Sequence, residues 1–275
     1  MRVEPPEERV RVKGELILVL AACAGVAACG PAPAARQVAA QASAQLAAYL
    51  PPPAVASAER RGQAVQLSGS ASPGATIRLA SPDGSAINGT ADARGSWRLS
   101  VPIGERPRLY SLSETSAGRL VRALGYLAVL PAPGPAAAML HPAASASVPP
   151  AAGAARGLAA IDYDASGTAM ASGRASPGES VRLSLDGREA GEDRAHASGE
   201  FSASLTRPLT PDTHALGLTG QRLHASVAFA APRAAQVATP PFDAQRLDGA
   251  WRIDWITPAG GVQSTLLFDP RGGRS

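Results

Sequence analysis

Residues 68–79 read Ser-Gly-Ser-Ala-Ser-Pro-Gly-Ala-Thr-Ile-Arg-Leu. The same pattern returns 104 residues later, at 172–183, as Ser-Gly-Arg-Ala-Ser-Pro-Gly-Glu-Ser-Val-Arg-Leu. An internal repeat of this kind indicates two copies of one small fold. The sequence therefore predicts two sister domains, one over residues 63–131 and the other over residues 161–231.

Apolar and polar residues alternate in both copies. Every second residue is apolar in 97–101 and again in 201–205, and both stretches begin with an aromatic residue after a Gly-x step. A period of two with one apolar face is typical of a strand that packs on a second sheet. Pro-Asp-Gly at 82–84 and Asp-Gly at 186–187 supply hairpin turns. The pattern predicts an all-β protein.

Further correspondences extend the repeat toward the end of each copy. They pair Leu112 with Leu216, Tyr110 with His214 and Tyr126 with Phe229. The segment 120–130 has apolar residues that also fit a helical spacing, but its counterpart in the second copy alternates clearly. We therefore expect a strand there, with Tyr126 on its inner face.

The two copies resemble bacterial immunoglobulin-like domains of the tandem kind found in surface and envelope proteins. The resemblance rests on the motif at 68–79, on Asp-Gly at 83–84 and on Ala-Arg-Gly-Ser-Trp at 93–97, and the two copies make up roughly half of the chain. It implies two tandem immunoglobulin-like β-sandwich domains of Greek-key topology. In that family the Pro-Gly turn links two early strands, and the Gly-x-aromatic motif opens a later core strand.

The first 30 residues resemble the lipoprotein signal peptide of bacteria. Residues 16–28 are an uncharged apolar run that follows several basic residues, and the run is shorter than the ~20 residues of a membrane span. Leu-Ala-Ala-Cys23 and Val-Ala-Ala-Cys29 each match the lipobox, in which the cysteine receives diacylglycerol. We expect lipidation at Cys29, because the fuller apolar run precedes it, with Cys23 as the alternative.

The resemblance also implies a location. Gly30 follows Cys29, so the aspartate signal for retention in the inner membrane is absent. This implies sorting to the outer membrane of a Gram-negative cell, with the protein facing the periplasm. The expected partners are the membrane, through the N-terminal lipid anchor, and an envelope protein or a glycan.

Pro/Ala-rich stretches separate the expected parts of the chain. The boundaries are 1–29 for the signal peptide, 30–62 for a Pro/Ala tether with a short helix, 63–131 and 161–231 for the two domains, 132–160 and 232–246 for linkers, 247–269 for a C-terminal β-hairpin and 270–275 for a flexible tail. Pro-rich segments are stiff and extended, so the tether would hold the first domain away from the bilayer.

Candidate catalytic and metal-binding groups are sparse. The four histidines (141, 196, 214 and 224) show no ligand spacing with a carboxylate, and Asp162-Tyr163-Asp164 offers too few carboxylates for a dedicated calcium site. No Gly-x-Ser-x-Gly elbow and no phosphate-binding glycine loop occurs. The net charge of +4 is spread out, which argues against a nucleic-acid partner. We expect no enzymatic activity, no metal and no cofactor.

Two tryptophans, Trp251 and Trp255, lie on one face of the expected C-terminal hairpin. Two interpretations stay open. The indoles could stack on sugar rings or enter a groove on a partner, or they could cover the open end of the second sandwich. The sequence thus favours a non-catalytic lipoprotein that acts as a spacer or protein-interaction module, with a glycan- or peptidoglycan-binding module using these tryptophans as the alternative.

Overall fold

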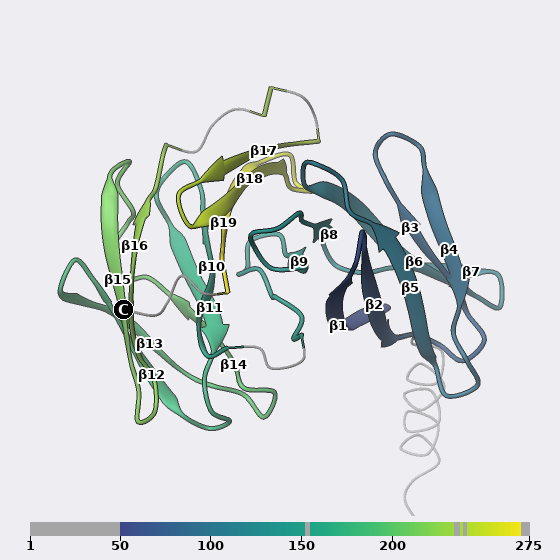
Figure 1. Cartoon of the computed structure of the whole chain (residues 1–275), viewed down its shortest axis with the longest axis horizontal. Helices are drawn as coiled ribbons and strands as arrows, with labels where there is room; N and C mark the ends of the chain where they lie inside the picture. The colour runs from purple at the N-terminus through teal and green to yellow at the C-terminus, as the bar shows by residue number, and fades with distance from the viewer. Residues whose placement is uncertain (1–49, 152–154, 234–236, 239–240, 271–275) are drawn as a thin grey trace, which may run out of the picture. The chain divides into compact units, whose positions relative to one another are not determined.

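The computed structural model describes residues 50–151, 155–233, 237–238 and 241–270, and these residues contain strands, turns and loops but no helix (Figure 1). Within this part of the chain, no helix is therefore long and apolar enough to span a bilayer. The expectations for the signal peptide, for Cys23 and Cys29, and for the short helix of the tether lie outside the described residues.

Module 1 is a β-sandwich of two antiparallel sheets. Its strands are β1 (Ala54–Arg61), β2 (Ala64–Ser70), β3 (Thr76–Ala80), β4 (Ala86–Thr90), β5 (Ser96–Pro102), β6 (Arg108–Ser116), β7 (Arg119–Arg122), β8 (Tyr126–Val129) and β9 (Ala137–Leu140). One sheet has the order β1-β2-β5, and the other has the order β4-β3-β6-β8-β9, with β7 paired to β6.

Module 2 repeats this arrangement. Its strands are β10 (Gly157–Tyr163), β11 (Ala169–Arg174), β12 (Ser180–Leu185), β13 (Arg188–Arg194), β14 (Glu200–Ser204), β15 (Thr213–Thr219) and β16 (His224–Ala230). The sheet β10-β11-β14 corresponds to β1-β2-β5, and β13-β12-β15-β16 corresponds to β4-β3-β6-β8. This three-plus-four arrangement of antiparallel strands confirms the prediction of two tandem immunoglobulin-like sandwiches.

Three C-terminal strands extend module 2 (Figure 1). They are β17 (Phe242–Leu247), β18 (Ala250–Ile256) and β19 (Val262–Phe268). β19 pairs antiparallel with β10, so the first sheet of module 2 becomes a six-stranded sheet with the order β14-β11-β10-β19-β18-β17. An isolated hairpin is marginally stable in water, and this pairing supplies the support that it needs.

The repeated Ser-Gly motif has a steric cause. Gly69 on β2 lies directly opposite Trp97 on β5, and a Cβ at this position would overlap both the Trp97 ring and the carbonyl oxygen of Ala54. Gly173 has the same relationship with Phe201. Only glycine leaves room for the aromatic ring that fills each sandwich core, so the motif and the Gly-x-aromatic step belong to one packing unit.

Strand pairing corrects the predicted alignment of the later strands. Leu79 lies opposite Leu112 on β6, whereas its counterpart Leu183 lies opposite Leu218 on β15, so Leu112 corresponds to Leu218 rather than to Leu216. The match of Tyr110 with His214 is wrong by the same two residues. A sequence offset alone cannot locate a register that hairpin lengths change.

Tyr126 does not correspond to Phe229, and the predicted inner position of its ring is wrong. Tyr110 pairs with Leu127, which lies in the core of module 1, so the adjacent Tyr126 points to the opposite face of β8. The segment 120–130 forms β7 and β8 instead of one strand. Gly125 separates them, at a φ of 88° and so close to the Leu140 carbonyl that a Cβ would overlap it.

Several segments expected to be linkers contain strands. β1 begins at Ala54, inside the tether predicted over 30–62, and β17 lies largely inside the linker predicted over 232–246. The segment 132–160 holds β9 and the start of β10. Alanine has a low strand propensity, so an Ala-rich strand resembles a linker in sequence. In the structure these alanines are small enough to let neighbouring sheets approach closely.

Buried apolar residues form three clusters. The first fills module 1 around Trp97, and the second fills module 2 around Phe201. The third cluster, here called the third core, comprises Leu109, Ala128, Leu130, Ala138, Leu140, Ala146, Ala160, Trp251, Ile253, Trp255 and Leu267. It joins the outer face of β6-β8-β9 to the outer face of β10-β19-β18, so the two modules are packed together.

Candidate functional site: the junction between the modules

The junction places both predicted binding tryptophans in the interior. Trp255 is 0% exposed and Trp251 is 8% exposed. The indole Nε1 of Trp255 donates to Thr265 Oγ1 at 3.2 Å, and that of Trp251 donates to the Pro133 carbonyl at 2.9 Å. Neither ring offers a face to a sugar, so the expected stacking surface is not present here. The indoles cover the junction with module 1 instead of the open end of the second sandwich.

β18 is buried on both faces, which explains its composition. Alternate residues from Trp251 to Trp255 enter the third core. On the other face Arg252 Nε donates to Asp254 Oδ1 at 3.0 Å, and Ser264 Oγ donates to the same oxygen. Arg252 also donates to the Arg233 carbonyl at 2.8 Å. This buried pair is fully hydrogen-bonded, as a charge removed from water requires.

The connecting segment, residues 141–151, is fixed to module 2 by side chains. Gln263 of β19 accepts a hydrogen bond from the Ala143 amide at 3.1 Å and donates to the carbonyls of His141 and Ala144 at 3.2 and 3.1 Å. Asp162 of β10 accepts from the Ala146 amide at 2.6 Å. The predicted free linker is therefore a bound part of the junction.

Asp162 is the most perturbed acid at this junction. Burial raises its pKa to about 6, although hydrogen bonds from Thr265, from the Ala146 amide and from Gln263 act in the opposite direction. Thr265 donates to Asp162 Oδ1 at 2.5 Å and accepts from the Trp255 indole. A chain of hydrogen bonds thus connects the buried indole, the hydroxyl and the carboxylate with the connecting segment. Asp164 lies apart, in a turn where it accepts from Ser166 and Thr168.

The loop 130–136 is held from two sides. Arg60 of β1 donates to the carbonyls of Leu130, Gly134 and Pro135 at 2.9–3.1 Å. Arg246 of β17 donates to the Pro133 carbonyl at 3.3 Å, forms a bidentate ion pair with Asp269 and lies 5.6 Å from the centroid of the Trp251 ring. Arginine is suited to this role, because its planar fork can serve several carbonyl and carboxylate oxygens.

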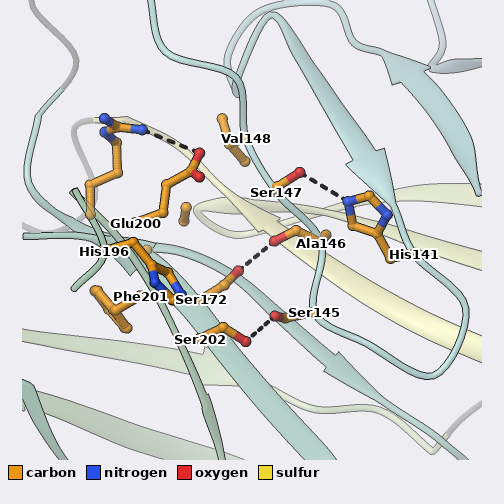
Figure 2. Close-up of a pocket in the computed structure, with 13 residues that line it drawn as sticks. His141, Ser145, Ala146, Ser147, Val148, Ser172, His196, Glu200, Phe201 and Ser202 are labelled. Carbon is orange, nitrogen blue, oxygen red and sulfur yellow. Dashed lines mark hydrogen bonds and ion pairs between the residues drawn. The ribbon is translucent and has the colours of Figure 1, made fainter. Parts of the chain in front are cut away.

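A small pocket of about 200 Å³ opens beside the connecting segment (Figure 2). His141 is hydrogen-bonded to Ser147 Oγ at 3.0 Å, and Ser172 Oγ donates to the Ala146 carbonyl at 2.6 Å. Ser145 and Ser202 are hydrogen-bonded to each other. Burial lowers the pKa of His141, against the opposing effects of the Leu124 backbone and the Glu200 charge.

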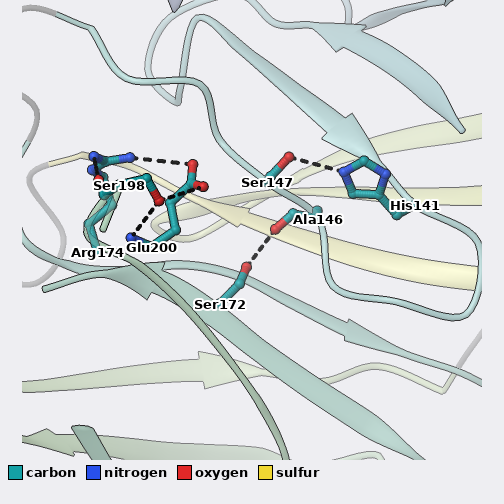
Figure 3. A network of polar contacts seen from close by, with 7 residues as sticks. All are labelled: His141, Ala146, Ser147, Ser172, Arg174, Ser198 and Glu200. Atoms are coloured by element: carbon teal, nitrogen blue, oxygen red, sulfur yellow. Dashed lines mark hydrogen bonds and ion pairs between the residues drawn. The ribbon is translucent and has the colours of Figure 1, made fainter. Parts of the chain in front are cut away.

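The polar groups of this pocket satisfy one another (Figure 3). Arg174 donates to the Ser198 carbonyl at 2.6 Å and lies 3.4 Å from Glu200 Oε1, while Ser198 Oγ donates to Glu200 Oε2 at 3.2 Å. The His141–Ser147 pair has no acid hydrogen-bonded to the imidazole in the described residues, so it lacks the third member of a catalytic triad. Figure 3 shows Arg174, Ser198 and Glu200 grouped apart from His141 and Ser147.

The remaining histidines have separate surroundings. His196 and His224 are exposed, and His214 is buried in module 2. His214 is hydrogen-bonded to Asp186 Oδ2 at 2.8 Å and to the Thr210 carbonyl at 2.9 Å. Burial acts to lower its pKa, but these two hydrogen bonds outweigh burial and raise it. Among the described residues, no group of three or more His, Cys, Asp or Glu side chains is arranged to hold a metal ion.

Sequence reasoning missed the two glutamates that hold the repeated Ala-Ser-Pro-Gly turn. In module 1 Glu114 is fully buried and accepts from the Ser72 amide at 3.0 Å and from Ser72 Oγ at 2.6 Å. In module 2 Glu179 accepts from the Ser176 amide at 3.0 Å and from the Arg222 amide at 2.6 Å. The repeated serine was the available signal, but the carboxylate comes from a different strand position in each copy.

No protein-family profile matches the chain, and no curated protein matches it. Among solved structures, the chain is similar to a "Biofilm associated protein - BSP domain" (TM-score 0.22, 12% identity), over 68% of this chain and 30% of that one. It is also similar to a "Central Fibronectin-III array of RIM-binding protein" (TM-score 0.26, 13% identity, 82% and 84% covered). A third similarity is to "Structural insight into host cell surface retention of a 1.5-MDa bacterial ice-binding adhesin" (TM-score 0.18, 13% identity, 76% and 81% covered). TM-scores of this size carry no argument about function.

Proposed function

We propose that this protein is a non-catalytic cell-envelope lipoprotein that acts as a spacer or protein-interaction module. In this proposal diacylated Cys29, or Cys23 as the alternative, anchors the chain in the outer membrane, and the two modules project into the periplasm. The lipobox-like sequences support the anchor, since more than one acyl chain makes membrane attachment durable.

The observation that carries the spacer proposal is the third core. A spacer must keep its modules at a constant separation, and free Pro/Ala linkers between two independent domains would not do this. Here Trp251 and Trp255 bury apolar surface between the modules, and Asp162 and Gln263 fix the connecting segment. The junction residues are used for cohesion, which supports a mechanical role over a catalytic one.

The alternative glycan-binding function finds no support in the junction. Sugar recognition by indoles needs an exposed ring face, and both C-terminal tryptophans have buried rings whose Nε1 atoms already donate to protein oxygens. We therefore favour the spacer and interaction function.

Rigidity can be tested with spin labels on the full chain in which Cys23 and Cys29 are replaced by serine. Asn88→Cys in module 1 and Glu192→Cys in module 2 are exposed sites for the pair of labels. The expected result is a distance distribution as narrow as that of a reference pair within module 1, Arg94→Cys with Leu120→Cys. A broad distribution between the modules would refute the spacer function.

The anchor needs a separate experiment. Expression of the unaltered chain in a Gram-negative host, followed by membrane fractionation and intact mass spectrometry, should give an outer-membrane protein that begins at diacylated Cys29. Cys29→Ala should abolish the modification and Cys23→Ala should leave it, and the reverse outcome would assign the anchor to Cys23. An unmodified protein in both variants and in the parent would exclude lipidation.

A further inference from the structure

β16 is an edge strand without the usual protection. It lies at the end of the sheet β13-β12-β15-β16 and, within the described part of the chain, pairs only with β15. Its sequence, His-Ala-Ser-Val-Ala-Phe-Ala, has no charged residue and no proline, and its register with β15 is regular over all seven residues. An edge of this kind presents unpaired backbone groups that can accept another strand.

The other long edge strands carry protection. β13 has five charged residues among seven and a bulge in its pairing with β12, and β1 has a bulge in its pairing with β2 and ends in Glu-Arg-Arg. β5 contains Arg98 and ends in Pro102, and β17 contains Asp243 and Arg246. Among the described edge strands of six or more residues, β16 alone has none of these features.

The sister module shows what such an edge accepts. β8 holds the same place in module 1 that β16 holds in module 2, since each pairs with the sixth strand of its sandwich. β8 is covered by β9, an antiparallel strand with the sequence Ala-Ala-Met-Leu whose four residues are all buried. The fold therefore accommodates an additional antiparallel strand of small and apolar residues at this edge, and module 2 lacks one.

We propose that β16 pairs antiparallel with β16 of a second copy of this chain and forms a two-fold symmetric dimer. Pairing centred on Val227 places His224 opposite Ala230 and Ser226 opposite Ala228. These four residues are exposed, and no like charges face one another in this register. The two four-stranded sheets then join into one, through the self-complementary contact that two-fold symmetry requires. This inference does not depend on the lipid anchor or on the spacer function.

Sedimentation velocity over a range of protein concentrations tests the dimer, with the full chain carrying serine at positions 23 and 29 to exclude disulfides and acylation. The parent should dimerise reversibly. The double variant Ser226→Lys with Ala228→Lys should raise the dissociation constant at least about tenfold, because like charges then oppose each other across the new pair. Both positions are exposed, so the variant should keep the denaturation midpoint and the circular dichroism of the parent.

Ala215→Lys is the matched control. Ala215 is exposed on the neighbouring strand β15, directly opposite Ala228, and should leave the dimer intact because it does not line the edge. Hydrogen exchange should show protection that rises with concentration and is confined to 224–230. A parent that stays monomeric, or a dimer that survives in the double lysine variant, would overturn the proposal. A monomeric parent whose β16 amides are protected by an added extended peptide would assign the edge to a foreign strand and would equally overturn it.

Discussion

The ring of Tyr126 meets the ring of Trp255 edge to face, with centroids 5.8 Å apart and planes inclined by 84°. Tyr126 belongs to β8 of module 1, and Trp255 belongs to β18, which is joined to module 2 through β19. The pair therefore lies across the junction and connects the first sandwich with the C-terminal strands.

Removal of the Trp255 ring should destabilise the protein. We expect Trp255→Ala to lower the free energy of unfolding by about 3–5 kcal/mol, because it leaves a cavity in the third core. Urea denaturation measures this. A double-mutant cycle of Tyr126→Leu and Trp255→Leu should give a coupling of about 0.5–1.5 kcal/mol, the range of aromatic pairs. Additive effects would show that the two rings do not interact.

Gly69→Ala should be costly, because the new Cβ would overlap the Trp97 ring and the Ala54 carbonyl. We expect a loss of about 1–3 kcal/mol or more, the cost of overpacking a filled core, and the same for Gly173→Ala against Phe201. Gly261→Ala is the matched control, since its nearest neighbour for a Cβ is Thr257 Oγ1 at 3.7 Å. Chemical denaturation of the three variants decides the matter, and equal stabilities would contradict the steric explanation of the motif.

Asp162 should make stability depend on pH. Its pKa is about 6 in the folded protein and 3.8 as the model value, so the folded state binds more protons between these values. The Asp162 contribution therefore falls as pH rises from about 4 to about 6 and is flat above, by about 3 kcal/mol in total. The measurement is the stability of the parent minus that of Asp162→Asn at a series of pH values.

This difference isolates Asp162 from acids with the opposite behaviour. Hydrogen bonds from Ser85 lower the pKa of Asp83, and the Arg222 amide lowers that of Glu179, so both favour the folded state as pH rises. Subtraction cancels these contributions because both proteins contain them. A difference that stays constant from pH 4 to pH 7 would show that Asp162 is not perturbed.

His214 should titrate above its ordinary value. Hydrogen bonds to Asp186 and to the Thr210 carbonyl outweigh burial and raise its pKa above 6.5. The stability that this raised pKa provides is complete below pH 6.5 and is lost as pH rises through the folded pKa. Proton NMR of the imidazole should show a lower His214 pKa in Asp186→Asn than in the parent. An unchanged titration would mean that Asp186 does not bind the charged ring.

The fold could be predicted from sequence because its determinants are local. Each Ser-Gly, Pro-Gly and Gly-x-aromatic step fixes a turn or a close contact within one sandwich, so the repeat of these steps identified two sandwiches. The face of Tyr126 could not be predicted, because it depends on the pairing of Leu127 with Tyr110 across a hairpin of unknown length. The alanines of β9 gave no strand signal, since burial between two sheets, and not propensity, places them there.

The junction was the least predictable part. The alternation of Trp251 and Trp255 showed which face is apolar but not what covers it, and the cover comes from β6, β8 and β9, far away in the sequence. Asp162 was noted only for its neighbour Asp164, whereas its partners are Gln263 and Thr265. Such contacts are fixed by tertiary packing, on which sequence spacing carries no information.

The place of β19 between β10 and β18 has a consequence for biosynthesis. β10 emerges from the ribosome long before the strand that will lie beside it, so one edge of its sheet must wait unpaired while all of module 2 is translated. Secretion in an extended state would postpone this closure until the whole polypeptide has crossed the membrane. A chaperone that shields the waiting edge would then guard the step at which this protein is most exposed to aggregation.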